Sequence, residues 1–287
     1  MIATRQLARR GHSIRGSSGR TAMRFRSQED ADEFQKEITQ AALRWGRPIW
    51  WYDWQQPFEQ LSISGASCFV QRSKTRCFGV TAAHVVEAIM EARSRTASLD
   101  CRIGLMPLYL PAVIIDWDRK LDIATFAISD QQVRNSGIQP FDISIHWPPP
   151  EGLVARQMPI QLVGFPEQLR EIDYAGHSVA CRAYGALALV EDYSDREIIT
   201  IYDPKQCVGE PSLLPLGFNL SGCSGGPAVI HQTLNKIHRW YPVGMILRGP
   251  KDSEGDATMF DMIRVRRIDC IDEEGRIGHA NTGWLPS

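Results

Sequence analysis

Residues 219–227 read Asn-Leu-Ser-Gly-Cys-Ser-Gly-Gly-Pro, and this stretch decides how the rest of the chain is interpreted. Glycines on both sides of Ser224 allow a tight turn, because glycine tolerates positive φ and lets another backbone come close. A serine in such a turn can expose its Oγ while neighbouring backbone N–H groups point at a developing oxyanion. Clusters of Gly, Ser and Pro are also common in ordinary loops. The stretch therefore indicates a nucleophile only if a base and an acid accompany it.

The chain supplies a candidate base and a candidate acid upstream. His84 follows an apolar, β-rich run and ends the motif Thr-Ala-Ala-His at residues 81–84. Asp122 opens a second apolar run with the motif Asp-Ile-Ala at residues 122–124. A serine nucleophile needs a base that takes its proton, and the base needs a carboxylate that fixes its tautomer. Each residue alone is typical of a strand end, but the order His, Asp, Ser indicates a catalytic triad.

In these three motifs the chain resembles the trypsin-like (chymotrypsin-fold) serine peptidases, over roughly residues 62–270. The resemblance implies an all-β fold of two six-stranded antiparallel β-barrels with an N-terminal helical extension. It implies that Ser224 is the nucleophile, His84 the general base and Asp122 the partner of the base. It also implies an oxyanion hole formed by the backbone N–H groups of Gly222 and Ser224, and a reaction that needs no cofactor or metal.

Substrate selection is predicted from the same family register. The resemblance places the substrate-binding residues in two segments, which contain Phe218, Asn219, Leu220, Ser221, Leu247, Arg248 and Gly249. Residues 218–220 hold no carboxylate, which tryptic members need for Arg or Lys, so we expect an uncharged residue before the cut. Cys223 is the alternative nucleophile, by analogy with viral relatives that carry Gly-x-Cys-Gly, but the position of the surrounding glycines selects Ser224. Cys223 cannot form the ion pair with a freed N-terminal amine that activates digestive members.

The pattern along the chain predicts five regions. Ser27 is a candidate N-cap for an amphipathic helix over residues 28–45. An aromatic-rich segment follows, which we expect to pack this helix onto the first barrel. The predicted regions are a basic tail (1–27), the helix and aromatic segment (28–60), a first barrel carrying His84 and Asp122 (61–147), a second barrel carrying Ser224 (151–270) and a C-terminal tail (271–287).

Charge and cysteine content limit the compartment and the partners. Residues 1–28 hold seven arginines and no acid, which fits a mitochondrial presequence, a basic arm for an acidic partner, or a plain tail. Seven scattered cysteines without a Cys-x-x-Cys pair argue against a zinc site or a secreted disulfide framework. We therefore predict a cytoplasmic protein, or a mitochondrial one if the tail is a presequence. The net charge of -1 gives no reason to expect nucleic acid or a membrane.

The sequence thus predicts a serine endopeptidase that acts on protein or peptide substrates through an acyl-enzyme. A regulatory protein could bind through residues 1–58, and the activity is expected to be gated by that partner or by the N-terminal segment. The alternative is a catalytically silent pseudoprotease that serves as a protein-binding module. Such proteins usually lack a triad residue, and none is missing here.

Overall fold

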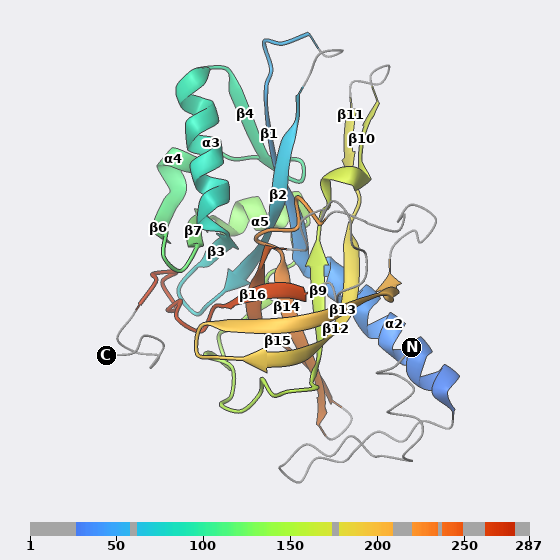
Figure 1. The fold of residues 1–287 in the computed structure, drawn as a ribbon. Helices are drawn as coiled ribbons and strands as arrows, with labels where there is room; N and C mark the ends of the chain where they lie inside the picture. The colour runs from blue at the N-terminus through green and yellow to red at the C-terminus, as the bar shows by residue number, and fades with distance from the viewer. Residues whose placement is uncertain are drawn as a thin grey trace.

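The computed structural model describes residues 27–57, 62–173, 178–208, 220–234, 237–248 and 262–278. The predicted basic tail lies almost entirely outside the described residues, as do Phe218, Asn219, Gly249 and the end of the predicted C-terminal tail. The described chain is mostly β and forms two curved β-structures, with the helices packed around them (Figure 1).

The first β-structure is an eight-stranded sheet in the order β5-β4-β1-β2-β3-β7-β6, with β8 paired to β2. Its strands are β1 (Gly46–Asp53), β2 (Ser64–Arg72), β3 (Cys77–Thr81), β4 (Leu99–Ile103), β5 (Met106–Pro107), β6 (Ile114–Asp118), β7 (Ile123–Ile128) and β8 (Phe141–Asp142). Among the described residues this sheet is a curled half-barrel whose path stays open between β5 and β6, so it is not the closed six-stranded barrel predicted here. β5 has only two residues, and the short helix α4 (Leu110–Val113) separates it from β6.

The aromatic-rich segment is strand β1, in the middle of this sheet. It pairs with β2 on one side and with β4 on the other, so the sheet begins at Gly46 and not at residue 61. Ile49, Trp50 and Trp51 are consecutive and all buried. Because successive side chains of a strand point to opposite faces, burial of all three means that both faces of β1 are covered.

The second β-structure is a closed six-stranded barrel, as predicted. Its strands follow one another in the order β12-β13-β16-β15-β14-β9. They are β9 (Pro159–Gly164), β12 (Tyr184–Tyr193), β13 (Glu197–Val208), β14 (Pro227–Leu234), β15 (Ile237–Arg248) and β16 (Met262–Arg267). A separate hairpin of β10 (Arg170–Asp173) and β11 (Ser178–Cys181) follows the one-turn helix η3 (Glu167–Leu169).

Helix α2 (Gln28–Ala42) confirms the predicted N-terminal helix, and η1 (Leu43–Trp45) continues it to β1. The Ser27 hydroxyl accepts a hydrogen bond from Asp30 N–H at 3.0 Å, which is the predicted N-cap. The helix packs against β9, β12 and β13, along the second barrel in Figure 1, so the prediction that the aromatic segment holds it on the first barrel is wrong. The other helices are α3 (Ala83–Arg95) and α5 (Asp130–Ser136).

A tight hairpin joins β2 and β3. Arg72 pairs with Cys77, and Ser73 N–H donates to Arg76 O at 2.9 Å, which centres the turn on Lys74 and Thr75. On its other side β2 pairs with β1, where Cys68 lies opposite Arg47.

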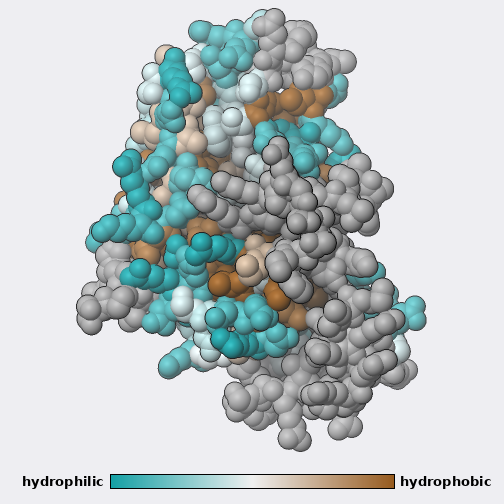
Figure 2. All heavy atoms as spheres, in the orientation of Figure 1, coloured by the Kyte–Doolittle hydropathy of each residue, from teal (hydrophilic) through white to brown (hydrophobic). Residues whose placement is uncertain are grey.

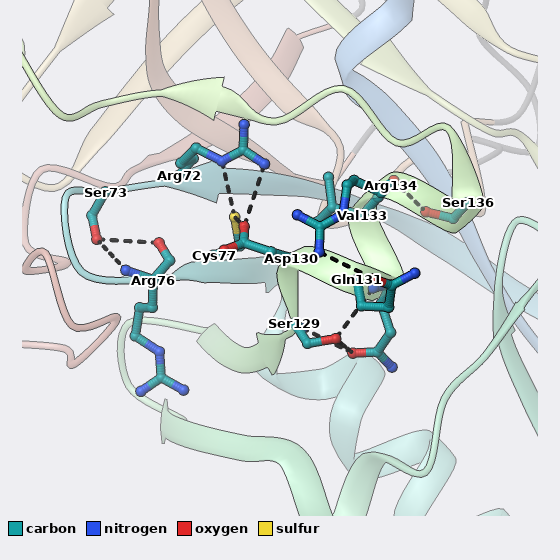
Figure 3. A network of polar contacts seen from close by, with 11 residues as sticks. Arg72, Ser73, Arg76, Cys77, Ser129, Asp130, Gln131, Val133, Arg134 and Ser136 are labelled. Carbon is teal, nitrogen blue, oxygen red and sulfur yellow. Dashed lines mark hydrogen bonds and ion pairs between the residues drawn. The ribbon is translucent and has the colours of Figure 1, made fainter.

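Cys77 takes part in a polar contact that ties α5 to this hairpin. Arg72 Nε lies 3.3 Å from Cys77 Sγ, which lies 3.3 Å from Asp130 Oδ1 at the start of α5. Figure 3 shows the three side chains meeting, beside the Ser129 cap of the helix. Burial is the largest influence on the Cys77 thiol and raises its pKa. The thiol thus serves as a neutral link between strand and helix.

A histidine contact between α2 and the second barrel leads to a prediction about pH. His231 on β14 lies 2.9 Å from His238 (Nε2 to Nδ1), and its ring centroid lies 4.6 Å from that of Trp240 and 6.1 Å from that of Phe34. Burial, and secondarily the charge of His238, lower the pKa of His231 to about 4. A histidine whose pKa is lowered by folding stabilises the fold above its unfolded pKa of about 6.5, and loses that contribution as the pH falls toward the folded value.

We therefore expect wild type to lose stability relative to His231→Gln between about pH 6.5 and pH 4. The measurement is the free energy of unfolding in urea for both proteins at several pH values. His146→Gln, at an exposed histidine, is the matched control and should run parallel to wild type. A constant difference between wild type and His231→Gln from pH 7 to pH 4 would contradict the prediction.

On the face shown in Figure 2, polar side chains cover much of the described surface, and apolar side chains occur in separate patches. The large exposed apolar side chains come from different elements of the fold: Trp54, Leu105, Tyr109, Trp117, Ile145, Tyr193, Ile237 and Met262. Among the described helices, none combines the length and the hydropathy that crossing a membrane requires.

Candidate active site

The structure brings His84 and Asp122 together at one end of the first sheet. His84 is the second residue of α3, and Asp122 directly precedes β7. His84 Nδ1 lies 2.8 Å from Asp122 Oδ2 and 3.1 Å from Oδ1. An ionised carboxylate only accepts hydrogen bonds, so Nδ1 carries the hydrogen and Nε2 is left as the basic nitrogen. The imidazole is 48% exposed, so the base is open to solvent.

Asp122 is held by more than the imidazole. His84 N–H donates to Asp122 Oδ1 at 3.0 Å, and Ala82 offers α3 no side-chain cap, so the carboxylate takes the place of an N-cap group. The backbone of Asp122 has φ 55°, in the left-handed region that Asp and Asn enter more readily than most residues. This conformation turns the side chain from the start of β7 toward the helix end, where its charge also suits the helix dipole.

The turn around Ser224, residues 221–226, is the candidate nucleophile turn. It lies against the first sheet, just before His84. Ser67 N–H on β2 donates to Ser224 O at 2.9 Å. Gly225 has φ 85°, and a Cβ there would lie 2.2 Å from Ser67 O and 3.1 Å from Ala82 N. Only glycine fits at this contact. The turn of the second β-structure is therefore pressed onto β2 and onto the residue before α3.

Hydrogen bonds fix the successive peptide planes of the turn. Ser221 O accepts from Glu167 N–H at 2.8 Å, and Cys223 O accepts from Gly226 N–H at 2.9 Å. Because the C=O and N–H of a trans peptide point in opposite directions, these bonds aim Gly222 N–H and Ser224 N–H away from Glu167 and Gly226. Within the described residues, neither N–H donates to another protein group. Two oriented and unused donors are what an oxyanion site requires.

Gly222 is the second position where a side chain does not fit. It has φ 92°, and a Cβ there would lie 2.7 Å from Phe165 O and 2.9 Å from Glu167 N. These contacts come from the backbone after β9, which cannot move aside as a flexible side chain would. Gly222 therefore lets this segment approach the turn and supply the Glu167 hydrogen bond.

The structure does not join Ser224 to His84. Ser224 Oγ donates to Leu247 O on β15 at 2.9 Å, and among the described residues it has no hydrogen bond with the imidazole. The hydroxyl hydrogen points at a backbone carbonyl in this state. Catalytic hydrogen bonds are often incomplete in unliganded enzymes and form with substrate. The Ser224 hydroxyl hydrogen would have to leave this carbonyl before it could be donated to His84.

Cys223 points away from the turn into the second barrel. Its side chain is 1% exposed, and a Cβ on Gly164 would lie 2.6 Å from Cys223 Sγ. Burial raises the pKa of its thiol well above the usual value. Since the thiolate is the reactive form, a buried protonated thiol is a poor nucleophile. The alternative of a cysteine nucleophile has no geometric support.

The described substrate-binding candidates lie on either side of the turn. Ser221 is exposed, whereas Leu220 is 3% exposed and packs in the core of the second barrel. Leu247 is also buried, and its backbone carbonyl holds Ser224. The backbone of Arg248 ends β15. The buried side chains of Leu220 and Leu247 therefore pack beneath the site and do not line an open pocket.

Comparison with known proteins does not assign this chain to a family. No model of a known protein family matches the chain, and the search of curated proteins finds no significant match. Within the described part of the chain, no group of three or more His, Cys, Asp or Glu side chains is placed to hold a metal ion.

Sequence reasoning missed two contributors to this site. Ser67 and the carbonyl of Leu247 both contact the nucleophile turn, from strands of different β-structures. A backbone carbonyl carries no signal in the sequence. Ser67 does carry one, because it is the one hydroxyl in the otherwise apolar run of residues 66–70.

Proposed function

We propose that this protein is a trypsin-like serine endopeptidase in which Ser224, His84 and Asp122 form the catalytic triad. The observation that carries the proposal is the His84–Asp122 pair, set on the sheet against which the Ser224 turn is pressed. The closed barrel and the curled sheet are compatible with a double-barrel peptidase fold. The unused N–H groups of Gly222 and Ser224 support the same reaction.

In this mechanism His84 Nε2 removes the Ser224 hydroxyl proton as Oγ attacks a peptide carbonyl. Asp122 holds the tautomer and stabilises the imidazolium that forms. The oxyanion is bound by the N–H groups of Gly222 and Ser224, each contributing about 3 kcal/mol to lowering the barrier. His84 then gives its proton to the leaving amine, and water hydrolyses the acyl-enzyme by the same steps.

The proposed enzyme is gated at Ser224. In the resting state its hydroxyl hydrogen is held by Leu247 O, so attack requires the side chain to leave this carbonyl first. β15 therefore controls the nucleophile as well as bordering the substrate site. A substrate or a regulatory protein that shifts Leu247 would release the hydroxyl. The hydrogen bond between Ser224 Oγ and Leu247 O also favours the second candidate function. In that case the protein is a catalytically silent binding module, and the serine stays bound to this carbonyl.

A fluorophosphonate probe separates the two candidates. We expect the folded wild-type protein to gain the mass of one probe, with peptide mapping assigning the adduct to Ser224. Ser62→Ala, at an exposed serine outside the turn, and Cys223→Ser should both be labelled. Absence of labelling in folded wild type would mean that Ser224 is gated or inactive, and would favour the binding module over a site that is competent as folded.

The substrate class is proposed from the sequence register. Residues 218–220 supply no carboxylate, so the residue before the cut is uncharged. Protein that reacts with the fluorophosphonate probe would be incubated with a mixture of fluorogenic peptides. The peptides that are cleaved would identify the residue preferred before the cut. Cleavage dominated by Arg or Lys would overturn this part of the proposal and leave the endopeptidase assignment intact.

A further inference from the structure

Ser67 is a fully buried serine that contacts the nucleophile turn with both its backbone and its side chain. It lies on β2 with 0% exposure, next to the turn but outside the triad. Its hydroxyl donates to Gly222 O at 2.7 Å and accepts from Phe165 N–H at 2.9 Å. Its N–H donates to Ser224 O at 2.9 Å, and its carbonyl accepts from Thr81 Oγ1 at 2.8 Å.

The Ser67 hydroxyl fixes the middle one of three consecutive peptide planes. The planes on either side carry Gly222 N–H and Ser224 N–H, and each is held by its own carbonyl, as described above. The middle plane, between Gly222 and Cys223, is held at one end by Ser67 Oγ and at the other by Cys223 N–H, which donates to Leu220 O at 3.0 Å. Rotation of the middle plane would change the angle between the two unused donors.

We propose that Ser67 is a positioning residue for the oxyanion hole, a role that rests on the proposed peptidase function. Its hydroxyl sets the Gly222 carbonyl, and through it the relative orientation of the N–H groups of Gly222 and Ser224. Donors aimed at the developing oxyanion act only if they are held in place before the reaction. Ser67 thereby links the oxyanion hole of the second β-structure to a strand of the first.

The link also gives the hydroxyl a role that a smaller residue could not supply. The Ser67 backbone N–H would still bind Ser224 O if the side chain were removed. Gly222 O would lose its donor and Phe165 N–H would lose its acceptor. The Ser224 segment would thus remain attached to β2, while the plane between the two oxyanion donors would be held at one end only, by the Cys223 N–H bond to Leu220 O.

The test compares Ser67→Ala with Ser98→Ala, which removes another buried serine hydroxyl from the first sheet region, away from the turn. The substrate is a fluorogenic peptide cleaved by wild type, and rates are normalised to the sites that a fluorophosphonate labels. We expect kcat of Ser67→Ala to fall about 10- to 100-fold, the scale of a small misplacement of catalytic groups, with KM changed less than about threefold. Ser98→Ala should match wild type.

A peptide aldehyde adds a readout that a purely structural role would not move, because it forms a tetrahedral adduct with an oxyanion. Its inhibition constant should rise by the same factor as kcat falls, while that of a non-reactive peptide amide stays constant. Ser67→Cys keeps a weaker donor on a larger atom, and we expect an intermediate loss. Both kcat and the inhibition constant of the aldehyde for Ser67→Cys should lie between those of wild type and Ser67→Ala, in the order of hydrogen-bond donor strength.

The outcomes separate this proposal from the proposed function. Wild type that is folded but neither labelled nor active would refute the peptidase assignment itself. An active wild type with Ser67→Ala equal to Ser98→Ala would overturn the role of Ser67 alone. Loss of folded protein in both Ser67 variants, read by circular dichroism, would assign Ser67 a structural role and likewise overturn the proposal.

Discussion

Ser224→Ala is expected to abolish peptide hydrolysis and fluorophosphonate labelling while leaving the fold intact. Removing the nucleophile of a Ser-His-Asp triad lowers kcat on the order of 10⁶-fold, because the remaining groups no longer act as a unit. Among the described residues the hydroxyl binds Leu247 O alone, so its loss should cost about 1 kcal/mol of stability. The measurements are kcat on a fluorogenic peptide and the free energy of unfolding in urea.

The pairing of a large kinetic effect with a small thermodynamic one is the diagnostic result. Ser62→Ala serves as the control, since it removes a serine hydroxyl from an exposed position outside the turn. Residual kcat above about 1% of wild type in Ser224→Ala would point to another nucleophile. Cys223 is the nearest candidate by sequence, and alkylation by iodoacetamide would then inhibit the variant.

The segments that carry the proposed chemistry could be predicted because each signal is local. The glycines around Ser224 are where the structure requires them, two of them at positive φ and in contact with other backbone. His84 lies shortly after strand β3 and Asp122 directly precedes strand β7, as the apolar runs beside them indicated. The helix cap at Ser27 was predictable for the same reason, since it depends on residues three apart.

The position of β1 could not be predicted, because its sequence argues against a central strand. Pro48 lacks the N–H that a ladder needs, and prolines are normally confined to edge strands. The aromatic side chains at residues 50–52 also give no polar–apolar alternation. Burial on both faces explains the missing alternation, and it depends on partners elsewhere in the chain. The closure of a sheet is likewise decided by the pairing of its end strands and is not written in any one segment.

The contacts that hold the turn around Ser224 could not be predicted, for a further reason. Ser67 and Gly222 are separated by 155 positions, and their contact exists only after the two β-structures pack together. Ser224 is held by the backbone carbonyl of Leu247. Every residue type has such a carbonyl, so the sequence gives no sign of this contact. Sequence reasoning thus identified the groups proposed to react, and the structure was needed to find the contacts that hold them.

Asp122→Asn is expected to lower kcat about 10⁴-fold, and the geometry explains why a nearly identical side chain fails. His84 N–H donates to Oδ1 at 3.0 Å, which fixes the oxygen of an asparagine at this place. Its NH₂ group would then replace Oδ2, 2.8 Å from His84 Nδ1. An amide N–H there donates to Nδ1, so the ring hydrogen moves to Nε2, and the base can no longer accept the Ser224 proton.

Stability should change little in this variant, which separates the tautomer effect from unfolding. Asparagine tolerates φ 55° as aspartate does, and its oxygen still accepts from the first turn of α3. Only the negative charge at the helix N-terminus is lost, which costs about 0.3–1 kcal/mol. Asp122→Ala is the contrasting variant, because it loses the cap and the tolerance for this φ as well as the charge.

The comparison of the two variants tests whether Asp122 acts on the imidazole or merely caps α3. If it acts on the imidazole, Asp122→Asn and Asp122→Ala lose activity on a similar scale, while only Asp122→Ala shows a clear drop in the free energy of unfolding. If it merely caps the helix, Asp122→Asn keeps more than a tenth of wild-type kcat on the same fluorogenic peptide. The second result would remove Asp122 from the proposed triad, since the carboxylate would then matter only as an acceptor for a backbone N–H.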